Sequence, residues 1–206
     1  MSESGIEQIM RLAPVIPVIV IDRVEDAVPL AEALVAGGLP VLEVTLRTPA
    51  ALDALAAMKK VPGAVVGAGT ILNTRMLNGA IDAGAEFIVS PGLTNDLGDA
   101  AVASGIAFLP GVANAGDIMR GLDLGLSSFK FFPAATSGGI PALKALIGPF
   151  GGLNFCPTGG ITPATAPEWL ALDAVLCVGG SWVVPAGPLD PARVEALARE
   201  AAALRP

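Results

Sequence analysis

A lysine inside an apolar segment is the first candidate for chemistry. Lys130 lies between two phenylalanines in SFKFFP, and the chain has only four lysines. Lysine is rarely buried, and burial disfavours the charged form of an amine. A neutral buried amine is a nucleophile that suits Schiff-base formation with a carbonyl substrate. The alternative is a lysine whose stem is buried and whose tip forms a salt bridge with Glu43.

A second set of polar residues alternates along VLEVTLRT. Glu43, Thr45 and Arg47 occupy every second position, so their side chains share one face of the predicted strand. The intervening valine and leucines then point toward the helices that pack on the sheet. Glu43 and Arg47 point the other way, into the interior of the fold or toward its opening. Buried charged residues usually have a functional role, although a structural ion pair would give the same alternation of polar residues. Glu43 is also the obvious proton carrier for a carbinolamine on Lys130.

Two Gly-Gly turns, in CPTGGITP and CVGGSW, are candidates for a phosphate site. Paired glycines allow close backbone approach, and N–H groups at a helix start favour an anion. The hydroxyls of Thr158 and Ser181 adjoin these turns. The alternative is that tight turns simply need glycine. The predicted phosphate-binding residues are Gly159, Gly160, Gly179, Gly180 and Ser181.

Three further turns follow apolar segments. Thr70 in VGAGT either caps the next helix or donates to a ligand carboxylate, and the sequence leaves both open. The Pro-Gly pairs in SPGLT and LPGVAN are typical of turns, and Asn114 is a candidate helix N-cap.

The absence of histidine excludes much chemistry. The chain contains no His and no Tyr, so it has no Ser-His-Asp or Cys-His catalysis and no His-ligated metal. Cys156 and Cys177 lie in apolar segments without CxxC spacing, which indicates buried reduced thiols. We expect neither a metal nor a cofactor.

Short β-rich apolar runs alternate with helical stretches, as in repeated βαβ units. The expected strands are residues 15–21, 41–46, 64–68, 87–90, 107–109, 128–132, 154–157 and 174–178. The expected helices are residues 24–36, 50–60, 74–83, 96–104, 115–124, 140–147, 164–170 and 191–204.

Eight such units predict an α/β protein with one domain over residues 1–206, an eight-stranded parallel (β/α)8 TIM barrel. Its active site is expected at the carboxyl ends of the strands, where the polar residues above fall. A doubly wound open sheet is the alternative, but no G-x-G-x-x-G follows the first strand.

Charge and hydropathy limit the partners. Twelve Lys and Arg against nineteen Asp and Glu give a net charge of −7 without a basic stripe, so we expect no nucleic-acid partner. The longest apolar run, residues 12–21, is too short to span a membrane, which needs about 20 apolar residues. The first ten residues lack the features of a signal peptide, so we expect a cytoplasmic protein.

The motifs together resemble a known family. In chain order they are EVTLRT, VGAGT, SPGLT, LPGV, FKFFPA, GGIPALKA, GPF, FCPTGGI and VGGSW, over about residues 15–185. They resemble the family of 2-keto-3-deoxy-6-phosphogluconate (KDPG) aldolase, which also cleaves 4-hydroxy-2-oxoglutarate. The resemblance implies a metal-independent class I aldolase on a TIM barrel, a homotrimer in the Entner–Doudoroff pathway.

The resemblance also implies roles for individual residues. Lys130 would be the Schiff-base lysine and Glu43 the general acid and base. Arg47 and Thr70 would bind the carboxylate of the pyruvate part of the substrate. Thr158 would contact the substrate near its hydroxyl groups and affect stereoselectivity.

The remaining implied roles concern the walls of the site. Phe132 and Pro91 would line the pyruvyl pocket, and the glycine turns would hold the distal phosphate. The sequence departs from many relatives at Ala113 and Asn114, where a Ser-Thr pair is common, and at Ala135, where an acidic residue is common. These departures leave the catalytic set intact and affect only the expected substrate preference.

Three other functions remain open at this point. The substrate could be a non-phosphorylated 4-hydroxy-2-oxoacid or the galactonate epimer. The protein could bind a sugar phosphate without turnover, because a fold alone does not imply chemistry. A barrel isomerase is the third, and it needs no imine.

Overall fold

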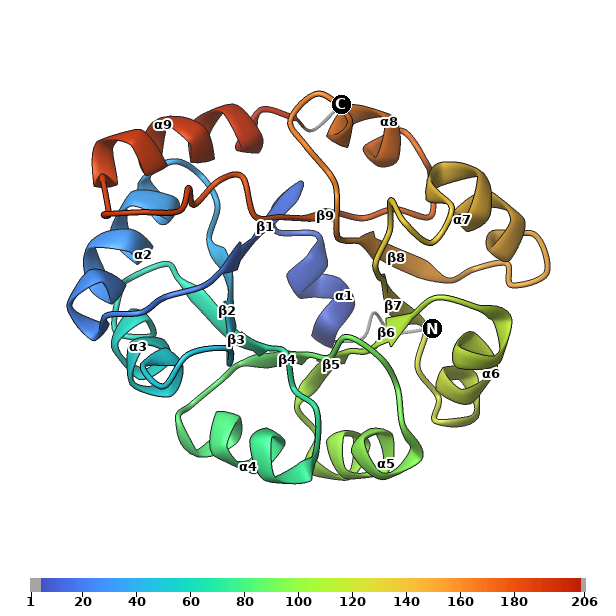
Figure 1. Ribbon diagram of the computed structural model, residues 1–206. Coiled ribbons are helices and arrows are strands. Elements are labelled where there is room, and N and C mark those ends of the chain that lie inside the picture. Colours follow the sequence, from blue (N-terminus) through green and yellow to red (C-terminus); the bar gives the residue numbers. More distant parts are fainter. Residues whose placement is uncertain (1–4, 205–206) are drawn as a thin grey trace.

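The computed structural model describes residues 5–204, in which parallel strands alternate with helices (Figure 1). The strands are β1 (Val15–Ile19), β2 (Val41–Thr45), β3 (Val65–Gly69), β4 (Phe87–Val89), β5 (Ala107–Leu109), β6 (Gly111–Val112), β7 (Ser128–Phe131), β8 (Asn154–Pro157) and β9 (Val178–Gly180). The helices are α1 (Gly5–Met10), η1 (Val24–Asp26), α2 (Ala27–Ala36), α3 (Ala51–Met58), α4 (Thr74–Asp82), α5 (Asn95–Ser104), α6 (Ala115–Asp123), α7 (Gly139–Ile147), α8 (Ala166–Leu170) and α9 (Pro191–Ala202).

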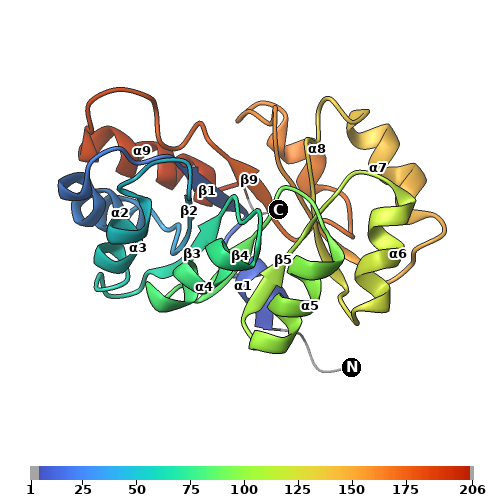
Figure 2. The same cartoon turned by 60° about the horizontal axis from the view of Figure 1, so that its bottom comes forward.

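The strands form two parallel sheets with helices on the outside (Figures 1 and 2). The six-stranded sheet has the order β5-β4-β3-β2-β1-β9, and the three-stranded sheet has the order β6-β7-β8. Pro110, which lacks an N–H group, separates β5 from β6, so β5 pairs with β4 while β6 pairs with β7. At the other boundary, β8 and the segment around β9 share only the isolated bridges Phe155–Val175 and Thr158–Gly179.

The expected closed eight-stranded (β/α)8 TIM barrel is therefore wrong. The six-stranded sheet is a half-barrel, and its hydrogen bonding does not run on continuously into the small sheet. The pattern of alternating strands and helices predicted the parallel α/β class correctly. It could not show where a ladder of hydrogen bonds between neighbouring strands is interrupted.

Two elements differ from the expected ones at the ends of the chain. The last strand was expected over residues 174–178, whereas β9 begins at Val178 and includes both following glycines. Glycine has a low strand propensity, but Gly179 and Gly180 pair with Ile16 and Pro17 of β1. Helix α1 was not predicted, because six residues are too few to show a helical period.

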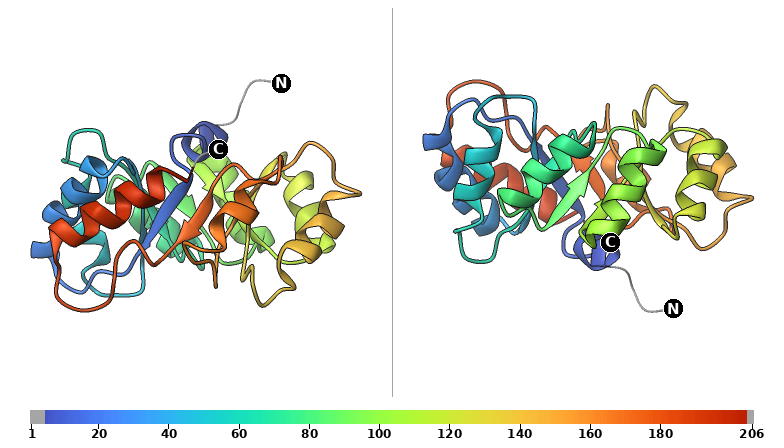
Figure 3. Two further views of the ribbon diagram at one scale, coloured as in Figure 1. Left: turned by 90° about the horizontal axis from the view of Figure 1, so that it is seen from above. Right: turned by 90° about the horizontal axis from the view of Figure 1, so that it is seen from below.

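The core has an outer and an inner part. The outer part fills the space between strands and helices, and the inner part lies under α1, where Ile6 and Met10 pack with Phe87, Val89 and Leu109. Helix α1 lies on one side of the two sheets (Figure 3). The loops that follow the strands lie on the side away from α1, at the carboxyl ends of the strands. The candidate site residues are found at this side.

Local capping agrees with the sequence at α6. Asn114 caps α6, as predicted, because its side-chain oxygen accepts a hydrogen bond from the Asp117 amide.

None of the helices within residues 5–204 is long and apolar enough to cross a membrane. The prediction of one domain over 1–206 stays a prediction, and residues 1–4 and 205–206 lie outside the described part.

Candidate active site

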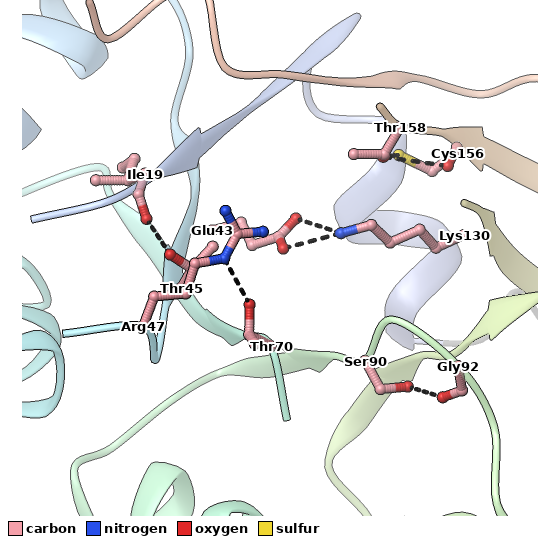
Figure 4. A network of polar contacts seen from close by, with 10 residues as sticks. All are labelled: Ile19, Glu43, Thr45, Arg47, Thr70, Ser90, Gly92, Lys130, Cys156 and Thr158. Carbon is pink, nitrogen blue, oxygen red and sulfur yellow. Dashed lines mark hydrogen bonds and ion pairs between the residues drawn. The ribbon is translucent and has the colours of Figure 1, made fainter. Parts of the chain in front are cut away.

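A buried ion pair joins the two sheets at the centre of the site (Figure 4). Lys130 of β7 donates from Nζ to Glu43 Oε1 of β2 at 3.0 Å, and Oε2 lies 3.5 Å away. The side chains are only 8% and 4% exposed. Nζ also lies 5.4 Å from the centre of the Phe132 ring, within the range of a cation–π contact. The two residues predicted to do chemistry are thus in direct contact.

The flanking aromatic side chains hold Lys130 on the inner face of β7. Phe129 and Phe131 alternate with it and point outward, where Phe129 packs with Phe155 and Phe131 with Trp169. Because side chains alternate along a strand, these outward contacts turn the lysine inward. The same alternation places the Glu43 side chain on the inner face of β2, as predicted.

Thr45 shares the face of Glu43 but has a structural partner. Its hydroxyl donates to the carbonyl of Ile19 at 2.8 Å, which ties β2 to β1. Thr48 repeats this contact further along, with its hydroxyl on the carbonyl of Ile21. These bonds fix the end of β2 from which the next candidate, Arg47, projects.

Arg47 and Thr70 meet at the exposed edge of the site. Arg47 Nε donates to Thr70 Oγ1 at 3.4 Å, so the side chain that follows β2 reaches the residue that follows β3. Thr70 has φ = 62°, and within residues 5–204 it is the only non-glycine residue with a positive φ. Such backbone strain persists where the surrounding structure requires it and is frequent at functional sites.

The alternative role of Thr70 as a helix cap is wrong. Helix α4 begins at Thr74, and its N-cap is Asn73, whose side chain accepts from the Met76 amide at 3.0 Å. The hydroxyl of Thr70 is therefore turned toward Arg47 instead of the helix.

Thr158 and the first glycine pair form a second part of the site. Thr158 is buried, and its hydroxyl donates to the Cys156 carbonyl at 3.4 Å. Gly159 and Gly160 follow with φ values of +100° and +74°, a conformation that favours glycine. Phe132 adjoins this turn as well as Lys130, so it lies between the two parts.

The second glycine pair has a different role from the predicted turn. Gly179 and Gly180 belong to β9, and Gly179 leaves the space that the Thr158 side chain fills. Ser181 is the first residue after the strand and is exposed. Only Ser181 of this trio therefore lies in the turn where the sequence placed all three.

The remaining predicted residues have neighbouring positions. Pro91 lies with its backbone against Gly111, which pairs with Lys130 in the small sheet. Sequence reasoning missed Ser90, a buried residue that donates to the Gly92 carbonyl at 2.6 Å and stabilises this turn. The signal available in the sequence was a serine between an apolar segment and a Pro-Gly pair.

The departures from the family pattern lie beside the site. Ala113 and Asn114 belong to the α6 cap, where the Ala113 amide donates to Asp117 at 3.0 Å. Ala135 donates from its amide to the Gly159 carbonyl at 3.0 Å and adjoins the glycine turn. Within the described residues, no three His, Cys, Asp or Glu side chains are grouped so that they could hold a metal ion.

These features define a parallel α/β protein with a buried amine and carboxylate in contact, a site suited to the chemistry of carbonyl compounds. The family model for KDPG and KHG aldolase matches residues 6–199, so the chain belongs to that family. It is an aldolase and therefore a lyase. The resemblance of the motifs is confirmed.

Three comparisons show how close the similarity is. The 2-dehydro-3-deoxy-phosphogluconate aldolase of Zymomonas mobilis is 64% identical over 97% of this chain and 96% of its own. A crystal structure of the Z. mobilis ZM4 2-keto-3-deoxy-6-phosphogluconate aldolase with 3-phosphoglycerate has a TM-score of 0.96, 64% identity and coverages of 98% and 96%. A Legionella pneumophila KDPG aldolase, with pyruvate captured at low pH as a covalent carbinolamine intermediate, has a TM-score of 0.91, 47% identity and coverages of 94% and 96%.

Proposed function

We propose that this protein is a class I aldolase that cleaves 2-keto-3-deoxy-6-phosphogluconate to pyruvate and glyceraldehyde 3-phosphate in the Entner–Doudoroff pathway. The observation that carries the proposal is the buried contact of 3.0 Å between Lys130 Nζ and Glu43 Oε1. The carbinolamine in the L. pneumophila relative supports it, because a carbinolamine forms when an amine adds to a carbonyl group.

Lys130 and Glu43 divide the chemistry between them. Glu43 takes a proton from the Lys130 ammonium group, the free amine adds to the C2 ketone, and Glu43 returns the proton as the carbinolamine loses water to give a protonated imine. Glu43, directly or through a water, then takes the proton of the C4 hydroxyl, and the C3–C4 electron pair moves into the imine. Glyceraldehyde 3-phosphate leaves, and the enamine is protonated at C3 and hydrolysed to pyruvate.

Arg47 and Thr70 bind the carboxylate next to the reacting ketone. The guanidinium group offers charge-assisted hydrogen bonds to a carboxylate, and the Thr70 hydroxyl already lies 3.4 Å from Arg47 Nε. Holding the carboxylate at this edge orients the ketone toward Lys130, so that the bound substrate is in a geometry in which the amine can attack. Phe132 and Pro91 line the space around the pyruvyl group.

Thr158, the turn of Gly159 and Gly160, and the end of β9 bind the far part of the substrate. The buried Thr158 contacts the hydroxyl groups and affects stereoselectivity, while Gly159, Gly160, Gly179, Gly180 and Ser181 provide the phosphate site. The 3-phosphoglycerate in the Z. mobilis structure supports a place for a phosphorylated three-carbon acid in this family. The enzyme needs no metal or cofactor in this proposal, because the imine acts as the electron sink.

The direct test is cleavage of the proposed substrate. Purified protein incubated with KDPG should release pyruvate and glyceraldehyde 3-phosphate in equal amounts, identified by mass spectrometry, and treatment with EDTA should leave the rate unchanged. Binding of KDPG without products would contradict the proposal and favour a sugar-phosphate-binding protein.

We also propose a homotrimer, which the family resemblance implies. Light scattering coupled to size-exclusion chromatography should give three times the mass of the chain. A monomer at micromolar concentration would contradict this assembly without affecting the proposed reaction.

A further inference from the structure

Gly69, at the end of β3, lies beside the carboxylate of Glu43. Strand β3 pairs with β2 so that Gly67 is opposite Glu43 and Gly69 is opposite Thr45. The Glu43 side chain extends along β2 and occupies the space where a side chain of residue 69 would be. A Cβ atom on Gly69 would overlap Glu43 Oε1 and lie 2.7 Å from Cγ and 2.9 Å from Cδ.

The backbone of Gly69 does not itself require glycine. Gly69 is not among the glycines with a positive φ, and it has the strand conformation that any residue adopts. Glycine in the interior of a strand weakens it and often marks a close approach of another group. The close approach here is that of the carboxylate that contacts Lys130.

We propose that Gly69 is a positioning residue for the aldolase reaction. By lacking a side chain, it lets the Glu43 carboxylate lie on the inner face of β3 with Oε1 3.0 Å from Lys130 Nζ. A methyl group at this position displaces the carboxylate and separates the base from the amine. This inference rests on the proposed function, since Glu43 is the proton carrier in that reaction.

Gly67 on the same strand provides a matched control. Its missing side chain leaves space for the ring of Phe87, and a Cβ atom there would lie 2.5 Å from ring carbons. Phe87 is fully buried in the inner core, so Gly67→Ala disturbs packing. The atoms that Gly69→Ala displaces belong instead to Glu43, a side chain that is not part of either hydrophobic core cluster.

The experiment is a double-mutant cycle. Gly69→Ala and Gly67→Ala are each made in the wild-type chain and in Glu43→Ala. The measurements are kcat and KM with KDPG, the rate at which borohydride traps pyruvate on the protein, and the melting temperature. We expect Gly69→Ala to lower kcat and the trapping rate by about 10²-fold, the cost of a misplacement of about 1 Å. KM and melting temperature should change little.

The Glu43→Ala background distinguishes positioning from a general defect. Without the Glu43 side chain, Gly69→Ala should cause less than a further threefold loss of trapping rate, because nothing remains to displace. Gly67→Ala should lower the melting temperature in both backgrounds. In the wild-type background, its kcat and KM with KDPG should stay close to the wild-type values.

Each other result contradicts the inference. An equal loss from Gly69→Ala in both backgrounds, an unchanged kcat, or a fall in melting temperature that is as large in Glu43→Ala as in the wild-type chain would show that Gly69 does not act through Glu43. If the wild-type protein itself neither cleaves KDPG nor traps pyruvate, the proposed function fails instead, so the two failures are distinguishable.

Discussion

The Lys130–Glu43 pair and the glycine turn of residues 159–160 are two regions of one site built by different means. The pair consists of long charged side chains that are buried and already in contact across the two sheets. The turn consists of backbone in a left-handed conformation, next to the buried Thr158 hydroxyl. This difference suggests that the reacting groups are organised in advance, whereas substrate selection relies on main-chain groups. Changes in the first region should affect every substrate, and changes in the second only phosphorylated ones.

Replacement of the amine should have the largest effect. Lys130→Ala removes the only proposed nucleophile, so KDPG cleavage should fall below detection while circular dichroism stays that of a folded protein. The exposed Lys144 of α7 offers a matched control, and Lys144→Ala should keep the wild-type rate. Residual turnover by imine formation in Lys130→Ala would remove this lysine from the mechanism.

Loss of the carboxylate should have the next largest effect. Glu43→Gln keeps the shape of the side chain but removes the general acid and base, which contributes typically about 10²–10⁴-fold. We expect kcat to fall within this range for KDPG and for 4-hydroxy-2-oxoglutarate alike, as measured by steady-state kinetics with both. A loss with only one of the two substrates would place Glu43 in recognition and not in the shared chemistry.

Arg47 should have a smaller effect that also applies to both substrates, since both carry the carboxylate. A hydrogen bond to a charged group contributes about 1.5–3 kcal/mol, so Arg47→Ala should lower kcat/KM by roughly 10- to 150-fold, mainly through KM. Arg47→Lys should recover part of this loss, because it keeps the charge without the planar guanidinium. An unchanged KM in Arg47→Ala would contradict carboxylate binding.

The phosphate side should give the smallest and most selective effect. Ser181→Ala removes one exposed hydroxyl at the end of β9, and we expect kcat/KM for KDPG to fall about tenfold, as for one hydrogen bond to a charged group. The value for 4-hydroxy-2-oxoglutarate, which has no phosphate, should stay the same. Equal losses with both substrates would contradict a role of Ser181 in phosphate binding.

Sequence reasoning succeeded where the signal is local. Alternation along β2 and β7 placed Glu43 and Lys130 on inner faces, because the strand period is short and the flanking residues are apolar. The Asn114 cap was predicted for the same reason, since a cap contacts the next few residues of its own helix.

It failed where the relevant neighbour is on another strand. The break at Pro110 depends on which strand each side pairs with, and the extent of β9 depends on pairing between its glycines and β1. The closeness of Gly69 to Glu43 depends on the register of β2 and β3. The family resemblance supplied the substrate, which neither periodicity nor composition contains.

Covalent capture of pyruvate tests the central claim most directly. The protein is incubated with pyruvate and sodium borohydride, and its intact mass and peptide map are compared with those of Lys130→Ala. We expect one reduced pyruvate adduct per chain, located at Lys130 and absent from the variant. No adduct, or an equal adduct in Lys130→Ala, would contradict imine formation at the buried pair.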